Sequence, residues 1–263
     1  IRHSAINSAV QPRSCGSTLK PFLYLTAIEQ RKLTAASLLP DTPDAITEEY
    51  ADYDPQNYSG NFRGPVRMRE ALGNSLNVPA VVALSRLGAR AVHGSLRNWG
   101  LNFPDTFDAS GAGFILGNAR VTLLDLAGAY ASLARGGVAC PPRFTPRQAA
   151  ETARVGSPES SAILTDILCD NAARRTTFGL QSPLEVGRRT AVKTGTSSGF
   201  RDGWCVGFNR RHTVAVWAGN LDGKPMAEML AVKAAAPLWS AIMHRLYEQG
   251  DEALHPIEPS EKL

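Results

Sequence analysis

Two residues near the start of the chain, Ser17 and Lys20, are spaced for nucleophilic chemistry. The segment from Gly16 to Ile28 predicts a helix, because an apolar stripe follows one of its faces: Phe22, Leu23, Leu25 and Ile28. Side chains three residues apart share a helix face, so this hydroxyl and this amine lie within reach of each other. A serine hydroxyl becomes a good nucleophile when a base takes its proton, and a lysine amine can be that base when burial suppresses its charge. The spacing therefore predicts a nucleophilic serine with a lysine base.

The same pair also has a plain structural interpretation. About one Ser-x-x-Lys is expected by chance in a chain of this length. In that interpretation Ser17 caps the N-terminus of the helix and Lys20 extends into solvent. Other motifs have to decide between the two.

A second chemical stretch is Lys193-Thr194-Gly195-Thr196, on a predicted strand. Residues alternate faces along a strand, so Lys193 and Gly195 share one side, and the glycine leaves room for a ligand backbone beside the strand edge. The hydroxyls of Thr194 and Thr196, with the charge of Lys193, can bind a carboxylate. A backbone N–H of this edge, with that of Ser17, can hold a developing oxyanion. The alternative is an edge-strand lysine that discourages aggregation, next to small turn residues.

A Ser-x-Asn sequence occurs twice. Ser59-Gly60-Asn61 lies in a polar segment, which is typical of a surface turn. Ser75-Leu76-Asn77 interrupts two apolar helical segments, where polar side chains face a packed interior or a cleft and need hydrogen-bond partners. We therefore assign Ser75 and Asn77 to the site.

The hydrophobic period changes along the chain. Helical periodicity fits the segments 66–72, 80–84, 89–98, 121–133, 157–173 and 231–249. Strands are predicted at 190–196, 204–208 and 213–219, and the short connection 209–212 predicts an antiparallel hairpin between the last two. The polar residues between positions 40 and 64 predict a long surface excursion. Together these elements predict an α/β fold with a mainly antiparallel sheet flanked by helices.

The composition is that of an ordinary globular protein. Of 263 residues, 43% are hydrophobic, which is enough for one large core or two small ones. The 28 Lys and Arg residues exceed the 24 Asp and Glu residues only slightly, and they form no dense basic run of the kind that binds nucleic acid. The four cysteines lack zinc-ligand spacing, and no apolar run is long enough to span a membrane. We expect no metal, no cofactor and no nucleic-acid partner.

Taken in chain order, the three motifs resemble the active-site set of the penicillin-binding protein and serine β-lactamase superfamily. Further stretches are similar to the transpeptidase domain of class A bifunctional penicillin-binding proteins: 16–24, 61–66, 116–118, 121–127, 202–204 and 217–220. The resemblance covers roughly residues 10–245, and the joint occurrence of the motifs argues against chance. It implies a β-lactamase/transpeptidase-like fold with a helical subdomain.

The resemblance also implies catalytic roles. Ser17 would attack the D-Ala-D-Ala bond of a peptidoglycan stem peptide, or the ring of a β-lactam inhibitor, and form an acyl-enzyme. Lys20 would be the general base for this attack. Ser75 and Lys193 would relay the proton to the leaving amine, and an amine from a neighbouring strand would then complete the cross-link. Each lysine would disfavour the charge of the other.

Substrate-binding roles are implied in the same way. Asn77 would hold an amide of the substrate. Thr194 and Thr196 would bind the terminal carboxylate, with Gly195 between them at the strand edge. The backbone N–H groups of Ser17 and Thr196 would form the oxyanion hole.

The resemblance suggests a domain organisation as well. Residues 1–250 would be the penicillin-binding transpeptidase domain, and residues 251–263 a C-terminal linker or tail. Relatives usually open with a pair of strands well upstream of the nucleophile, so we expect these strands to be missing from the sheet here. The longer protein would carry a glycosyltransferase domain and a membrane anchor, at the periplasmic face of the bacterial inner membrane.

Two other classes of protein stay open at this level. One is a hydrolase on the same fold, a D,D-carboxypeptidase or β-lactamase, although the chain has no Glu-x-x-Leu-Asn stretch of the kind that β-lactamases use to aim a water. The other is a β-lactam-binding module without turnover. A stable penicillin adduct at Ser17 supports a transpeptidase or a binding module, rapid release of the adduct favours the hydrolase, and the absence of an adduct favours an inactive fragment.

Overall fold

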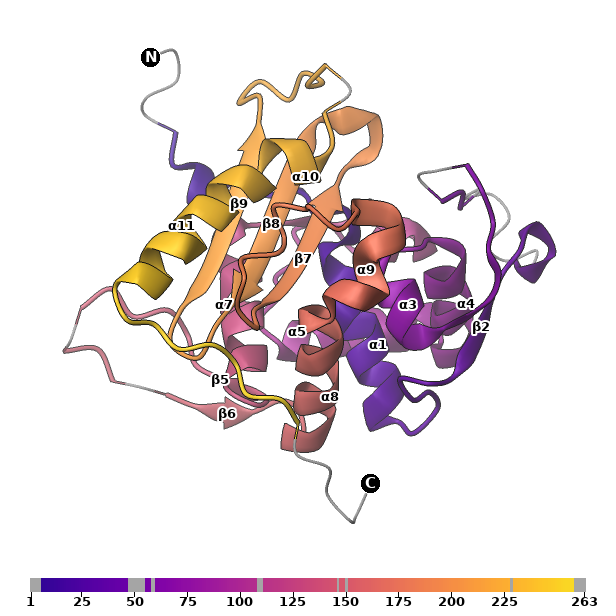
Figure 1. Ribbon diagram of the computed structural model, residues 1–263, viewed down its shortest axis with the longest axis horizontal. Helices are drawn as coiled ribbons and strands as arrows, with labels where there is room; N and C mark the ends of the chain where they lie inside the picture. The colour runs from indigo at the N-terminus through magenta and orange to yellow at the C-terminus, as the bar shows by residue number, and fades with distance from the viewer. Residues whose placement is uncertain are drawn as a thin grey trace.

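A three-stranded antiparallel sheet lies at the centre of the fold (Figure 1). The computed structural model describes residues 6–46, 55–57, 60–107, 111–145, 147–149, 151–227 and 229–257. The sheet has the order β7-β8-β9, and its strands are Ala191–Thr196, Asp202–Phe208 and Thr213–Gly219. The predicted hairpin is confirmed, because β8 and β9 pair antiparallel with Phe208 opposite Thr213.

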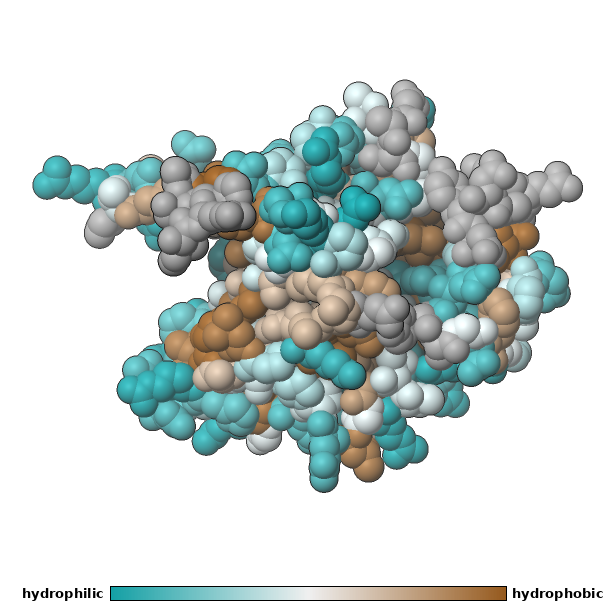
Figure 2. All heavy atoms as spheres, turned by 90° about the horizontal axis from the view of Figure 1, so that it is seen from above, coloured by the Kyte–Doolittle hydropathy of each residue, from teal (hydrophilic) through white to brown (hydrophobic). Residues whose placement is uncertain are grey.

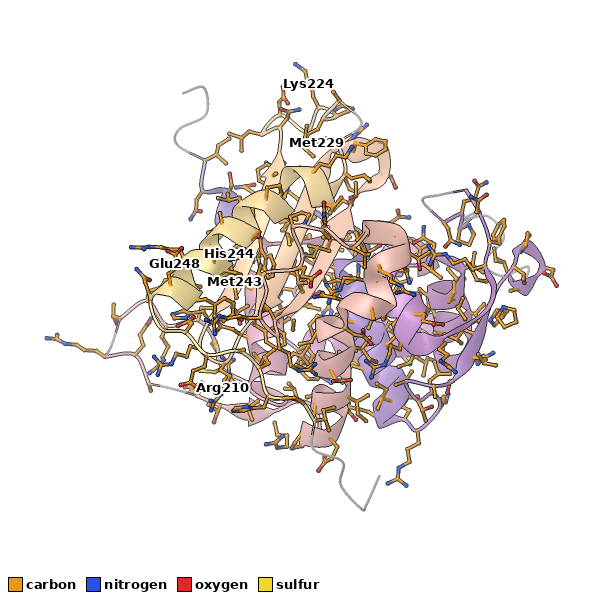
Figure 3. All side chains as sticks on the ribbon, viewed as in Figure 1. Arg210, Lys224, Met229, Met243, His244 and Glu248 are labelled. Atoms are coloured by element: carbon orange, nitrogen blue, oxygen red, sulfur yellow. The ribbon has the colours of Figure 1, made fainter. Side chains whose placement is uncertain are left out.

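Helices cover both faces of this sheet (Figure 1). Helix α11 (Ala236–Glu248) packs on one face, where Trp239 and Met243 are completely buried against strand residues such as Val192. In Figure 3 the labelled Met243, His244 and Glu248 all come from this helix, and the last two are on its exposed side. Helix α7 (Leu123–Ala134) packs on the other face. The single helix predicted at 231–249 is instead two.

The break between those two helices has a simple cause. Helix α10 (Ala231–Ala234) ends before Ala235, and Pro237 lies in the first turn of α11. Proline has no N–H and clashes with the preceding turn inside a helix, so it is accommodated at a helix start.

A helical subdomain adjoins the sheet. Its central helix is α1 (Lys20–Glu29), in which eight of ten residues are buried. The other helices around it are α3 (Met68–Gly73), α4 (Val78–Leu87), α5 (Ala89–Asn98), α8 (Pro158–Cys169) and α9 (Asn171–Phe178). Phe22 of α1 contacts the rings of Trp99 and Tyr130, at centroid distances of 5.6 and 5.3 Å. Burial of aromatic rings on this scale anchors α1, and therefore the residues at its N-terminus.

Two further predicted elements differ from the structure. Val66 and Arg67 belong to strand β3 (Gly64–Arg67), not to a helix, and β3 pairs with β2 (Leu38–Asp41) inside the expected surface excursion. The helix predicted at 157–173 is interrupted at Asp170, whose carboxylate accepts a hydrogen bond from the Ala173 N–H and so starts α9. Hydrophobic periodicity does not predict where a side-chain cap of this kind ends one helix and begins the next.

The remaining strands are short pairs. They are β1 (Arg13–Ser14) with β4 (Arg120–Val121), and β5 (Val138–Ala139) with β6 (Ala153–Arg154). Within the described part of the chain, no strand pairs with the outer edge of β9. The mixed α/β architecture with antiparallel sheets agrees with the prediction from sequence.

The chain after α11 runs back along the molecule. Residues 251–257 form neither helix nor strand, yet the Leu254 N–H donates to the Arg189 carbonyl at 3.0 Å and the carboxylate of Asp251 accepts from Asn209. Seen from above (Figure 2), hydrophilic side chains cover most of the surface and apolar ones gather in smaller areas. None of the helices in the described residues has the length and apolar character needed to cross a bilayer.

Candidate active site

Ser17 lies on a short 3-10 helix that leads directly into α1. This helix, η2 (Gly16–Leu19), places Ser17 half-buried on the wall of a cleft of about 560 Å³. The Lys20 N–H donates to the Ser17 carbonyl, so the three-residue spacing is fixed by the backbone itself. Cys15, not Ser17, stands at the N-cap position, and no side chain caps this end. The interpretation of Ser17 as a helix cap is therefore wrong.

Glycines bring the backbone of Ser17 against the sheet edge. Gly16 has a φ of +54°, and a Cβ on it would lie 2.6 Å from the Thr196 nitrogen and 2.7 Å from the Thr196 oxygen. On the other side, a Cβ on Gly117 would lie 2.7 Å from the Gly16 Cα. Only glycine permits such an approach at this backbone angle. The peptide groups that flank Ser17 and Thr196 are therefore close neighbours.

Lys20 is completely buried, and three oxygens surround its amine. The Nζ atom donates to the Ser75 carbonyl at 2.8 Å, the Leu76 carbonyl at 3.1 Å and the Asn77 Oδ1 at 2.5 Å. These acceptors favour the ammonium form, whereas complete burial and the nearby charge of Lys193 favour the neutral amine. Burial is the larger effect, and the pKa of Lys20 lies well below its ordinary value. The solvated lysine of the alternative interpretation is wrong.

Lys193, on strand β7, contacts the same turn at Ser75 that Lys20 contacts. Its Nζ donates to the Ser75 hydroxyl at 2.8 Å and to the Thr194 carbonyl at 2.8 Å. Burial lowers the pKa of Lys193 to about 7, and the charge of Arg174 adds to this effect. The sequence predicted mutual repulsion of the two lysines, and this holds for Lys20; for Lys193 the cation that contributes is an arginine that sequence reasoning missed.

The burial of Arg174 could not be predicted from the sequence. Arg174 is 4% exposed on α9, and its guanidinium donates to backbone carbonyls, including those of Val192, next to Lys193, and Leu168. Its neighbour Arg175 is exposed. Nothing in the sequence distinguishes these adjacent arginines, because only the packing of α9 against β7 decides which one is buried.

The Ser-x-Asn motif at Ser75 lies between the two lysines, at the turn from α3 to α4. Ser75 has a φ of +59°, a strained conformation for a residue with a side chain. The Asn77 amide donates to the Gln56 carbonyl at 2.6 Å while its oxygen accepts from Lys20. In this structure Asn77 thus positions the lysine amine. Ser59 of the other Ser-x-Asn sequence lies outside the described residues.

A buried carboxylate supports this turn, and sequence reasoning missed it too. Asp41 is fully buried, and the Asn57 amide donates to both of its oxygens at 2.8 and 2.9 Å. The Asn57 oxygen in turn accepts the Asn77 N–H at 2.9 Å. This chain of hydrogen bonds links strand β2 to Lys20 through two asparagines. Asp41 and Asn57 fall in the segment that was predicted as a surface excursion because its residues are polar. Two of these polar residues are instead buried and hydrogen-bonded to each other.

Strand β7 closes the cleft opposite this turn. Thr194, Gly195 and Thr196 line it together with Ser17, Ser75 and Asn77. We expected the space beside Gly195 to receive a ligand backbone, but a Cβ there would lie 2.5 Å from the Cys15 carbonyl oxygen and 2.7 Å from Thr18 Cγ2. The glycine instead lets β7 pack against the segment that carries Ser17. The Thr196 hydroxyl accepts from the Ala231 N–H at 3.0 Å and keeps its own proton to donate.

All eight residues singled out in the sequence meet here. Six line the cleft, and the two lysine amines lie behind it, joined through Ser75 and Asn77. In the described residues, no group of three or more His, Cys, Asp and Glu side chains is placed to hold a metal ion. The arrangement offers a hydroxyl, two buried amines of lowered pKa and a strand edge, which is the set that acyl transfer requires.

The model of the penicillin-binding protein transpeptidase domain matches residues 2–244 of this chain. The chain belongs to this family. The transpeptidase domain is 36% identical to penicillin-binding protein 1C of Escherichia coli, over 88% of this chain and 29% of that protein. It is 29% identical to penicillin-binding protein 1A of Aquifex aeolicus, over 97% of this chain and 36% of the relative. It thus spans about a third of the length of these relatives.

Solved structures of relatives share the fold. The PonA1 protein of Mycobacterium tuberculosis in complex with penicillin V superposes with a TM-score of 0.81, at 23% identity, over 98% of this chain and 75% of that one. Penicillin-binding protein 1A of Haemophilus influenzae superposes with a TM-score of 0.82, at 24% identity, over 97% of this chain and 46% of that one. The β-lactamase/transpeptidase-like fold expected from the sequence motifs is therefore confirmed.

Proposed function

We propose that this domain is a serine D,D-transpeptidase that cross-links peptidoglycan stem peptides and is acylated by β-lactams. The observation that carries the proposal is the meeting of Lys20 and Lys193 at Ser75, beside a cleft lined by Ser17. The family and the names of the relatives, which are penicillin-binding proteins, support it.

Acylation begins at Ser17. Its oxygen attacks the carbonyl carbon of the D-Ala-D-Ala bond while Lys20 takes the hydroxyl proton. Burial favours the neutral amine that this step needs, and Asn77 holds the amine in place. Two backbone N–H groups, of Ser17 and Thr196, stabilise the oxyanion, and each such donor contributes about 10²–10³ in rate.

Expulsion of the leaving group needs a proton. As the C–N bond breaks, Lys193 gives its proton through the Ser75 hydroxyl to the departing D-Ala amine. A pKa of about 7 suits this donation near neutral pH. In the second half-reaction an acceptor amine attacks the ester, its proton returns through Ser75 to Lys193, and Lys20 restores the Ser17 hydroxyl. Protons balance over the cycle.

Substrate binding uses the sheet edge. Thr194 and Thr196 bind the terminal carboxylate of the donor peptide, helped by the charge of Lys193. Asn77 binds a substrate amide by exchanging one of its present partners. Residues 1–250 form this transpeptidase domain, and 251–263 form its C-terminal tail.

The names of the relatives support a proposal about the cellular location of the domain. They are bacterial penicillin-binding proteins, so the cell envelope is its location. We propose the periplasmic face of the inner membrane, with a glycosyltransferase domain and an anchor in the longer protein.

Labelling with fluorescent penicillin tests the proposal. We expect a stable adduct whose mass locates to the peptide that contains Ser17. Ser17→Ala abolishes labelling, whereas Ser59→Ala, in the other Ser-x-Asn sequence, labels like the wild type. Retained labelling of Ser17→Ala refutes the nucleophile, and rapid release of the adduct identifies a hydrolase instead of a transpeptidase.

A further inference from the structure

One wall of the cleft carries a cation that the proposed mechanism does not use. Arg63 immediately precedes strand β3, and its backbone N–H donates to the buried Asp41 carboxylate at 3.0 Å. Its guanidinium NH2 donates to the Thr177 hydroxyl at 2.9 Å. Hydrogen bonds therefore hold this residue at its backbone and at its guanidinium, and Arg63 forms part of the cleft wall.

No carboxylate among the described residues pairs with this guanidinium. Among the described residues that line the cleft, Arg63 is the one charged side chain, and none is acidic. Other arginines of the domain pair with carboxylates, such as Arg69 with Asp166 and Arg120 with Asp105. In the described part of the chain, the guanidinium of Arg63 bonds to a neutral hydroxyl alone. Because a guanidinium has five N–H donors in a planar fork, several stay available for an anion.

The guanidinium also lies near the reacting residues. The Thr177 N–H donates to the Asn74 side-chain oxygen at 2.9 Å, and Asn74 is the residue before Ser75. Thr177, Asn74 and Arg63 all line the same cleft as Ser17. This wall faces the cleft from the helical side, whereas the proposed site of the terminal carboxylate is on strand β7.

We propose that Arg63 binds a second carboxylate of the donor peptide, carried by a side chain on the acyl side of the scissile bond. The inference rests on the proposed function and specifies its substrate: a peptide with an acidic side chain in addition to its terminal carboxylate. A planar, bidentate Arg–carboxylate pair gives specificity as well as affinity.

Two penicillins that differ at one group test this inference. One carries an adipoyl side chain that ends in a carboxylate, and the other carries the same chain ending in a carboxamide. We measure the second-order rate constant of acylation for both, with the whole chain. The wild type prefers the carboxylate by about tenfold, the lower end expected for a hydrogen bond to a charged group. Arg63→Gln loses this preference while its rate with the carboxamide stays unchanged.

Two further variants separate charge from structure. Arg175→Gln removes an exposed positive charge from α9 and keeps the preference. Arg63→Lys retains part of it, because the charge remains without the bidentate fork. The inference is overturned if the wild type shows no preference, if Arg63→Gln keeps it, or if Arg63→Gln slows both penicillins equally. Absence of acylation by either penicillin refutes the proposed function, and the inference with it.

Discussion

Replacement of Lys193 by methionine tests the buried, weakly basic amine directly through the pH dependence of stability. The pKa of Lys193 is about 7 in the folded state and 10.5 in the unfolded chain. Between these values the unfolded state binds more protons, so the free energy of unfolding rises with pH. Methionine fills a similar volume and does not titrate, so Lys193→Met loses this contribution.

The size of the effect follows from the two pKa values. Integrated from pH 7 to 8.5, the proton difference at Lys193 amounts to about 1.2 pH units, or about 1.6 kcal/mol of added stability. Lys20 acts in the same direction, since its pKa is also lowered. Cys15, Cys169 and Cys205 act oppositely as the pH approaches 9, because burial raises the pKa of each thiol above its ordinary value of 9.0. Wild type and variant share these thiols, so comparing their two slopes removes that opposing contribution to first order.

Urea titrations at pH 7.0, 7.5, 8.0 and 8.5 measure the free energy of unfolding and its slope with pH. We expect the rise between pH 7 and 8.5 to be smaller by about 1.6 kcal/mol in Lys193→Met than in the wild type. Lys233→Met, which removes an exposed lysine, serves as the matched control and keeps the wild-type slope. Equal slopes in wild type and Lys193→Met would show that Lys193 titrates near its ordinary pKa, and the proton-donor role would then be abandoned.

Two further predictions concern packing and charge around this amine. Gly195→Ala puts a Cβ 2.5 Å from the Cys15 carbonyl oxygen, so the strand has to shift. We expect the free energy of unfolding measured in urea to fall by about 1–3 kcal/mol and penicillin acylation to become slower. An unchanged acylation rate would contradict the close packing. Arg174→Met removes the cation that helps to lower the pKa of Lys193. The limb of the acylation rate–pH profile that reports Lys193 should therefore move to higher pH. Arg175→Met removes an exposed arginine and should leave that limb in place.

Local sequence was enough for the motifs but not for their surroundings. Ser17 and Lys20 are three residues apart, about one helical turn, so their spacing predicts that they share a helix face. The structure keeps helical geometry between them, across the junction of η2 and α1. Element boundaries were less predictable. Asp170 divides one expected helix into two through a single side-chain cap, and pairing between β2 and β3 depends on residues more than twenty positions apart.

The sequence by itself determined which chemistry the chain can perform, since residue types and short spacings specify a hydroxyl, two amines and a strand edge. Tertiary structure alone decided how those groups are tuned. Burial of Arg174 but not Arg175, and the link from Asp41 through Asn57 to the lysine turn, arise from segments distant in sequence. The physical reason is that a pKa depends on desolvation and on neighbouring charges, and both are properties of the packed fold and not of any one segment.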